Sequence, residues 1–284
     1  MNPGDACFTP EGASRLPANC WSDGRLDASD EVVADEVPVA LSYNGISHAV
    51  MLASPQDLED FALGFSLGER IVRHARDIYD IEVEPTCSGI AIEMRIAAGA
   101  LARLKHSRRA RLGKTGCGLC GVESLAWFDD EALDPPQCPA PSSALSCAFE
   151  HAALHRAMAA MAARQRLHHA TGAVHAAGWA SRDGTLLCVR EDVGRHNALD
   201  KLVGALAAAG QDRSDGFAVV TSRASFEMVQ KAARAGFPVL AAISAPTALA
   251  VKLAEQAGLS LAGFVRGGRH VLYTHAQRFG AKAV

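Results

Sequence analysis

The sequence predicts an α/β protein whose larger domain has a mostly parallel sheet, with a smaller α+β domain before it. In the C-terminal half, apolar strands alternate with helical stretches, which is typical of a sheet covered by helices on both faces. In the N-terminal part the strands come in pairs instead. We expect a flexible tail (1–30), a small α+β domain (31–104), a mobile loop (105–145) and an α/β domain (146–284).

The tail is predicted to be flexible because it is rich in Pro, Gly, Ser and Asp and shows no periodicity. In the small domain, Asn44-Gly45 supplies the positive φ angles of a type I′ turn and predicts a hairpin of strands 37–43 and 46–52. A helix is then expected from Ser54-Pro55, since serine is a common N-cap and proline suits the first helical position. Further strands are expected at 78–83 and 90–96.

The predicted loop carries Cys117 and Cys120 within Thr-Gly-Cys-Gly-Leu-Cys-Gly, downstream of a cluster of arginines and a lysine. Glycines let the backbone bend, and nearby cations favour the thiolate, which is both the nucleophile and the metal ligand. A structureless connection of this length is usually functional or disordered, and the cysteine pair favours a functional one.

Three functions compete for this cysteine pair. Structural zinc needs four ligands, and the sequence has no second pair, so zinc would have to be shared between subunits. A thioredoxin-like redox pair would sit at a helix start after a strand. The remaining interpretation is sulfur handling, in which a thiolate accepts sulfur from a donor persulfide and the loop carries it to an acceptor.

The α/β domain is expected to place polar residues where its strands end, which is where ligands bind in open α/β sheets. Its predicted elements are helix 147–166, strands 172–180 and 185–193, helix 197–209, strand 217–222, helix 226–235, strand 239–244, helix 246–257, and strands 261–265 and 270–274. The polar residues at strand ends are Asp192, His196, Ser222, Arg223, Ser244 and Thr247. Each alone could be a helix cap, an ion pair or a buried histidine, but together they favour a polar ligand.

Near the C-terminus, Gly263-Phe264-Val265-Arg266-Gly267-Gly268-Arg269 combines two arginines with a flexible Gly-Gly. The planar guanidinium group suits phosphates, although a solvated surface hairpin explains these residues equally well.

Composition limits the remaining classes of protein. The formal net charge of −3 gives no overall basic field, so nucleic-acid binding is not expected. No apolar run reaches the length of a bilayer span and no secretory signal is visible, so we expect a cytoplasmic protein without membrane insertion.

The motifs TGCGLCG, EDVGRHNALDKL, TSRASFEMVQKAARAG, SAPTALAVKLAEQAGLSLAGFVRGGR and YTH resemble those of the formate dehydrogenase accessory (FdhD) sulfur carriers. The resemblance covers about residue 35 to the end. It implies a cytoplasmic sulfurtransferase that takes sulfur from a cysteine desulfurase. Such a protein would pass that sulfur to the molybdenum bis(molybdopterin guanine dinucleotide) cofactor of formate dehydrogenase. Cys117 would form the persulfide with Cys120 as its partner, and Phe264, Val265, Arg266, Gly267, Gly268 and Arg269 would contact the cofactor.

The resemblance also implies a homodimer and a larger domain with the cytidine deaminase fold, without a catalytic metal of its own. Zinc deaminases need a zinc ligand two residues before a catalytic glutamate and a later Pro-Cys-x-x-Cys. Here Gly116 precedes Cys117, and the sequence contains no His-x-Glu. Two other functions stay open: a non-catalytic chaperone for the cofactor or the apo-enzyme, and a zinc nucleotide hydrolase.

Overall fold

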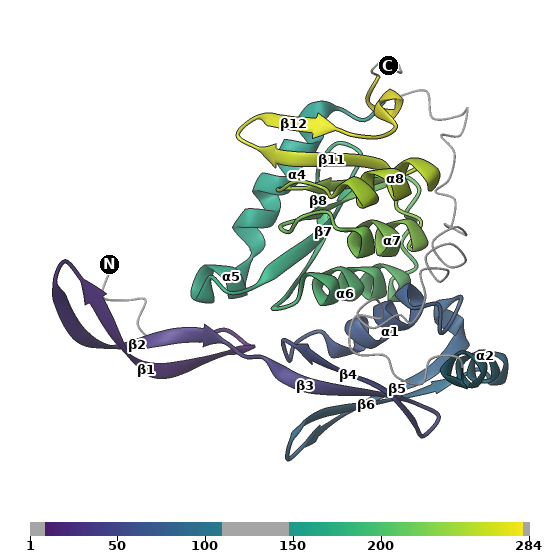
Figure 1. Ribbon diagram of the computed structural model, residues 1–284, viewed down its shortest axis with the longest axis horizontal. Helices are drawn as coiled ribbons and strands as arrows, with labels where there is room; N and C mark the ends of the chain where they lie inside the picture. Colours follow the sequence, from purple (N-terminus) through teal and green to yellow (C-terminus); the bar gives the residue numbers. More distant parts are fainter. Residues whose placement is uncertain (1–8, 110–147, 281–284) are drawn as a thin grey trace.

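A computed structural model describes residues 9–109 and 148–280, which form three β-sheets with helices packed on the two larger ones (Figure 1). Cys117 and Cys120, for which the sequence predicts the sulfur chemistry, lie outside the described residues. Within the described part of the chain, no helix combines the length and apolar character needed to cross a bilayer.

The larger unit contains a six-stranded sheet in the order β12-β11-β10-β9-β7-β8. Its strands are β7 (His175–Ser181), β8 (Leu186–Asp192), β9 (Gly216–Val220), β10 (Val239–Ala242), β11 (Ser260–Arg266) and β12 (Arg269–Leu272). Only β9, β10 and β11 pair in parallel, and the other neighbours are antiparallel. The sheet is therefore mixed rather than mostly parallel, because short turns at 182–185 and 267–268 permit only antiparallel pairing.

Helices cover both faces of this sheet, as the alternation predicts. Along β10, Val239 and Ala241 pack in the core beneath α4 (His151–Arg164). Leu240 and Ala242 point to the opposite core. That second core lies beneath α6 (Arg195–Ala208), α7 (Phe226–Arg234) and α8 (Ala248–Gln256). The predicted helix 147–166 is α4, which is a few residues shorter, and a separate short helix, α5 (Arg166–Thr171), follows after Gln165.

The smaller unit is a four-stranded sheet in the order β4-β3-β6-β5. Its elements are β3 (Val37–Tyr43), β4 (Ile46–Ala53), α1 (Leu58–Gly68), η1 (Ala75–Asp77), β5 (Ile78–Thr86), β6 (Gly89–Ile96) and α2 (Ala98–Arg109). Asn44 and Gly45 have φ angles of 48° and 75°, which confirms the predicted turn. The predicted helix cap is wrong: Asp57 occupies the N-cap of α1, because the Ser54 hydroxyl accepts a hydrogen bond from Val193 N at 3.1 Å.

Residues assigned to the flexible tail form a two-stranded sheet instead. The strands β1 (Ala13–Ser22) and β2 (Arg25–Ala34) pair around Asp23-Gly24, whose φ angles are both positive. This hairpin projects from the smaller unit (Figure 1). Its side chains are mostly exposed on both faces, so the sequence lacks the apolar alternation that predicts a half-buried strand.

The two units pack closely through α1 and α6. A Cβ atom at Gly64 would overlap the carbonyl oxygen of Asp200, and one at Gly204 would overlap that of Asp60. Because neither glycine carries a side chain, the two helix backbones can approach at these positions. Arg190 Nη2 on β8 also pairs with Asp60 Oδ2 at 2.7 Å across the same contact.

A buried lysine adds a second link between the units. Lys231 Nζ on α7 lies 2.9 Å and 3.0 Å from the two carboxylate oxygens of Asp200 and 3.1 Å from Glu69 Oε1. The Lys231 side chain is almost completely buried, and the two carboxylates raise its pKa despite that burial. The ammonium group therefore stays charged inside the contact.

Candidate functional site

Five strand ends meet at one edge of the six-stranded sheet. The parallel strands β9, β10 and β11 end there, and so does β8, while β7 starts there because it runs antiparallel to β9. The loops after β9 and β10 are joined by a bridge between Ala224 and Pro246. Phe264 N on β11 donates to Ser244 O at 3.2 Å. The structure thus brings the polar loops after β9 and β10 together, next to the end of β11.

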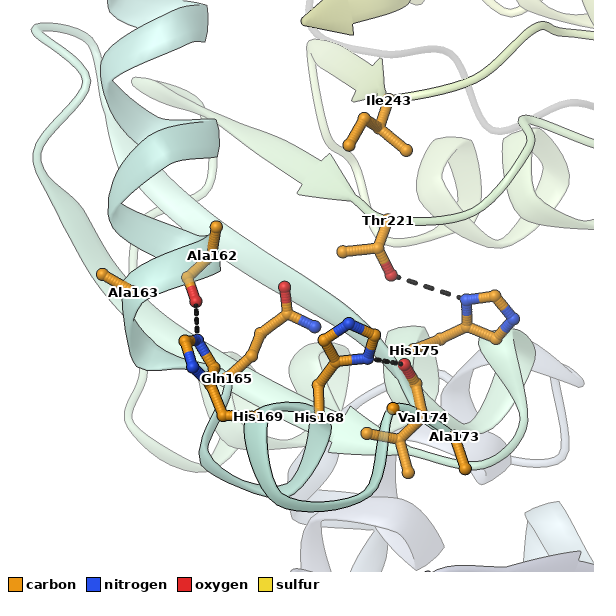
Figure 2. A pocket seen from close by; sticks show the side chains of 11 residues that line it. Ala162, Ala163, Gln165, His168, His169, Ala173, Val174, His175, Thr221 and Ile243 are labelled. Atoms are coloured by element: carbon orange, nitrogen blue, oxygen red, sulfur yellow. Dashed lines mark hydrogen bonds between the residues drawn. The ribbon is translucent and has the colours of Figure 1, made fainter. Parts of the chain in front are cut away.

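A half-open pocket of about 700 Å³ lies at this edge, between the strand ends and the junction of α4 and α5 (Figure 2). Its volume is in the range of small-molecule sites. Its walls combine small apolar side chains with imidazole, hydroxyl and carboxamide groups. The lining residues are Ala162, Ala163, Gln165, His168, His169, Gly172, Ala173, Val174, His175, Thr221 and Ile243.

Most polar side chains of the pocket are held in place by the backbone. His168 Nδ1 lies 3.0 Å from Val174 O, and His169 Nε2 lies 2.6 Å from Ala162 O. Thr221 Oγ1 accepts from Ala176 N at 2.9 Å and lies 3.5 Å from His175 Nδ1. Because carbonyl oxygens only accept, each of the first two histidines carries its proton on the named nitrogen when neutral.

The pocket edge carries positive charge that acts on His175. Burial lowers the pKa of His175, and the nearby Arg195, His168 and His196 lower it further. At neutral pH the His175 imidazole is therefore uncharged, and it can donate or accept one hydrogen bond at each nitrogen.

Asp192 cannot contact a ligand directly, which corrects the sequence prediction. Its side chain is fully buried, and Oδ2 lies 2.8 Å from Lys201 Nζ and accepts from Ser54 N at 3.0 Å. Oδ1 accepts from Gly194 N at 2.7 Å and from Asn197 Nδ2 at 3.0 Å. This carboxylate fixes the turn after β8 onto the end of β4.

His196 is also tied into the scaffold. Its Nε2 lies 2.6 Å from Glu227 Oε2 on α7, and this contact lowers the pKa of Glu227 despite partial burial. The pair links the first turns of α6 and α7 at the pocket edge. The alternative that His196 braces this region is therefore the one that the geometry supports.

The remaining predicted residues divide between exposed and buried positions. Val265 is completely buried in the core under α4, so its side chain cannot meet a ligand. Ser222 is 4% exposed and its hydroxyl donates to Arg223 O at 3.0 Å. Thr247 caps α8 through Ala250 N, whereas Arg223 is exposed on its loop. Phe264 has a φ of 56°, an unusual value for a residue with a side chain.

Gly267 and Gly268, at φ angles of 57° and 73°, form the turn between β11 and β12. Arg266 and Arg269 are exposed and face each other across this turn, and the Arg266 guanidinium lies 5.9 Å from the centre of the Phe264 ring. Two guanidinium groups at an exposed turn suit an anionic ligand.

Three histidines hold this hairpin against α4. His270 on β12 lies between two residues one turn apart on α4, with Nε2 at 2.9 Å from His151 Nδ1 and Nδ1 at 3.1 Å from His155 Nε2. Burial lowers the pKa of His270, and so do the two neighbouring imidazoles. Each nitrogen–nitrogen contact holds one hydrogen. The three linked imidazoles can therefore bind one extra proton at a free nitrogen, but binding a second extra proton breaks one of the two contacts.

Sequence reasoning missed Gln165 and His175 as pocket residues. One signal was available for His175. A strand that runs antiparallel to the parallel strands begins at the sheet edge where those strands end, and His175 is the first residue of such a strand, β7. Gln165 gave no such signal, because its position depends on the break between α4 and α5. Among residues 9–109 and 148–280 no three side chains are arranged to hold a metal ion.

Comparisons with known proteins match nearly the whole chain. The model of the FdhD/NarQ family matches residues 34–280, so the β1–β2 hairpin lies almost entirely outside it. The sulfur carrier protein FdhD of Cupriavidus necator is 55% identical over 275 residues, 97% of this chain and 92% of that protein. The protein of the same name from Variovorax paradoxus is 52% identical over 279 residues, 98% of this chain and 97% of that one.

A solved structure shares the fold. It is that of a putative formate dehydrogenase accessory protein from Desulfotalea psychrophila, with a TM-score of 0.72 and 23% identity. The match covers 94% of this chain and 98% of that one.

Proposed function

The chain belongs to the FdhD/NarQ family, and from this membership we propose that it is a sulfur carrier that serves the maturation of formate dehydrogenase. The observation that carries the proposal is the 55% identity to a sulfur carrier protein over 97% of the chain. The Cys117-x-x-Cys120 pair among glycines and cations supplies the chemistry that such a carrier needs.

In the proposed reaction, Cys117 accepts sulfur from a cysteine desulfurase. The Cys117 thiolate attacks the terminal sulfur of the desulfurase persulfide. A sulfur–sulfur bond forms at Cys117 while the donor bond breaks, and the desulfurase thiolate leaves. The transfer is a displacement in which one sulfur atom moves without net oxidation, so no external oxidant or reductant takes part.

Onward delivery as sulfide needs two electrons, which we assign to Cys120. Its thiolate attacks the inner sulfur of the Cys117 persulfide, S–SH. The bond to the terminal sulfur breaks, hydrosulfide leaves towards the acceptor, and a Cys117–Cys120 disulfide remains for a cellular thiol to reduce. The acceptor substrate in this proposal is the molybdenum bis(molybdopterin guanine dinucleotide) cofactor.

The described edge of the six-stranded sheet fits such an acceptor. It offers the pocket of about 700 Å³ and the exposed Arg266 and Arg269 for phosphate groups. Arg223 and Ser244 lie on the neighbouring loops. The side chains of Asp192 and Val265 are left out of this role because they are buried.

Further parts of the proposal rest on the family resemblance. We place the protein in the cytoplasm as a homodimer. Residues 105–109 of the predicted loop form the end of α2, so we assign the delivery role to the part of the predicted loop that follows this helix. The α/β/α layering of residues 148–280 supports a fold related to the cytidine deaminases.

Intact mass spectrometry tests the carrier role. Three proteins are incubated with a cysteine desulfurase and cysteine: wild type, Cys117→Ala and the control Cys87→Ala. The control removes an exposed thiol in the turn between β5 and β6. We expect a reducible gain of one sulfur mass in wild type and in the control only. No gain in wild type would contradict the carrier role and favour a non-catalytic chaperone for the cofactor or the apo-enzyme.

A further inference from the structure

The Gln165 side chain is a buried polar group without a hydrogen-bond partner in the described structure. It is 4% exposed and lines the pocket at the break between α4 and α5. Its Nε2 is buried, and no described residue accepts from it. A buried donor left unpaired is unfavourable, and a molecule bound in the pocket that Gln165 lines would supply the missing acceptor.

The neighbouring groups do not meet this demand. His168 Nδ1 and His169 Nε2 donate to the carbonyl oxygens of Val174 and Ala162, and no acceptor atom of the described residues lies within hydrogen-bonding geometry of Gln165 Nε2. Figure 2 shows the Gln165 carboxamide between these two rings, pointing to the side of the pocket where Thr221 lies. The nearby walls are apolar, formed by Ala162, Ala163, Ala173, Val174 and Ile243.

The chemistry of a carboxamide defines what it binds best. Its oxygen accepts and its nitrogen donates side by side, whichever way the group is turned. A ring that carries a carbonyl next to an N–H, a heterocyclic lactam, offers the matching acceptor and donor. Apolar walls around such a pair keep water away from both hydrogen bonds, which strengthens them.

We propose that Gln165 is a specificity-determining residue that binds the lactam edge of a heterocycle in this pocket. The assignment rests on the proposed function, because the guanine dinucleotide cofactor carries such an edge on its guanine and on its pterin. The carbonyl oxygen of the ring accepts a hydrogen bond from Gln165 Nε2–H, and the ring N–H donates one to Gln165 Oε1. His168, whose Nδ1 holds its proton against Val174 O, offers Nε2 as a further acceptor when neutral.

Binding of two probes tests the assignment and separates the two sources of a lactam. Calorimetric titration with GDP and with 6-hydroxymethylpterin is carried out on wild type, Gln165→Leu, Gln165→Glu and the control Gln256→Leu, which changes an exposed glutamine of α8. We expect at least one probe to bind wild type and the control equally. Its affinity should fall about 10-fold or more in Gln165→Leu, which removes both hydrogen bonds to the ring. Gln165→Glu should also weaken it, because a carboxylate cannot donate.

The outcomes are distinct from those of the sulfur-carrier test. If the affinity for GDP falls in Gln165→Leu, the pocket holds the guanine of the cofactor. If the affinity for the pterin falls, the pocket holds the pterin. Unchanged affinity of both probes in Gln165→Leu, or no binding of either to wild type, overturns the assignment. Sulfur uptake by Cys117 is measured in the same variants, so a failed carrier function and a failed lactam site give different results.

Discussion

The contact between α1 and α6 gives a quantitative prediction for Gly204→Ala. A Cβ at this position would meet backbone atoms of Asp60, which cannot rotate away as a side chain can. Alanine in a helix interior would by itself stabilise by about 0.5–1 kcal/mol. Overpacking typically costs about 1–3 kcal/mol, and an overlap with backbone atoms belongs in the upper part of that range, about 2–3 kcal/mol, so we expect a net loss of about 1–2.5 kcal/mol. Urea denaturation should show it as a lower midpoint at unchanged slope.

A matched substitution separates the clash from the change in residue type. Gly99 also lies in a helix, α2, but the nearest atom to an added Cβ is Arg103 Nη1 at 3.9 Å, the far end of a flexible side chain. Gly99→Ala should therefore be neutral or slightly stabilising. If Gly204→Ala unfolds at the same urea concentration as wild type, or a higher one, close packing of the two helix backbones does not limit stability.

Two more predictions concern ionisable groups in contacts between elements. Lys231→Met leaves the Asp200 carboxylate buried without its cation and should cost about 3–5 kcal/mol in urea denaturation, while adding Asp200→Asn should recover part of that loss. An additive effect of the two substitutions would show that the pair does not interact. The lowered pKa of His270 means that its stabilising contribution is complete above its ordinary pKa of 6.5 and is lost as the pH falls below that value. Wild type should therefore lose stability more steeply than His270→Asn between about pH 6.5 and 5. His106→Asn, at an exposed position on α2, is the control, and equal slopes for wild type and His270→Asn would contradict a coupled imidazole chain.

Local signals in the sequence predicted most of the fold. Asn44-Gly45 sets a turn by its backbone angles, whatever the rest of the chain does. The β1–β2 hairpin escaped because neither of its faces is buried, so no alternation marks it. The extent of parallel pairing was overestimated, since strand order and direction cannot be read from the alternation of strands and helices alone.

The candidate site was predicted only as a place, the edge where the strands end. Asp192 looked like a ligand because its partners were not visible: Lys201 is nine positions on, and Ser54 lies in the other unit. Gln165 looked like an ordinary helix residue because only the break after α4 turns it into the pocket. A polar residue's role depends on its neighbours in space, which spacing along the chain does not give.

The buried carboxylate of Asp192 has a consequence for cooperativity. Its hydrogen bonds join the end of β4 to the turn that opens α6, and the lysine of that helix, Lys201, donates to Ser54 O at 3.0 Å. Separating the two units would expose the charges of Asp192 and Lys201 or leave them without partners, and the same holds for Lys231 and Asp200. The two sheets are therefore thermodynamically coupled and should melt in a single calorimetric transition, although each has a hydrophobic core of its own.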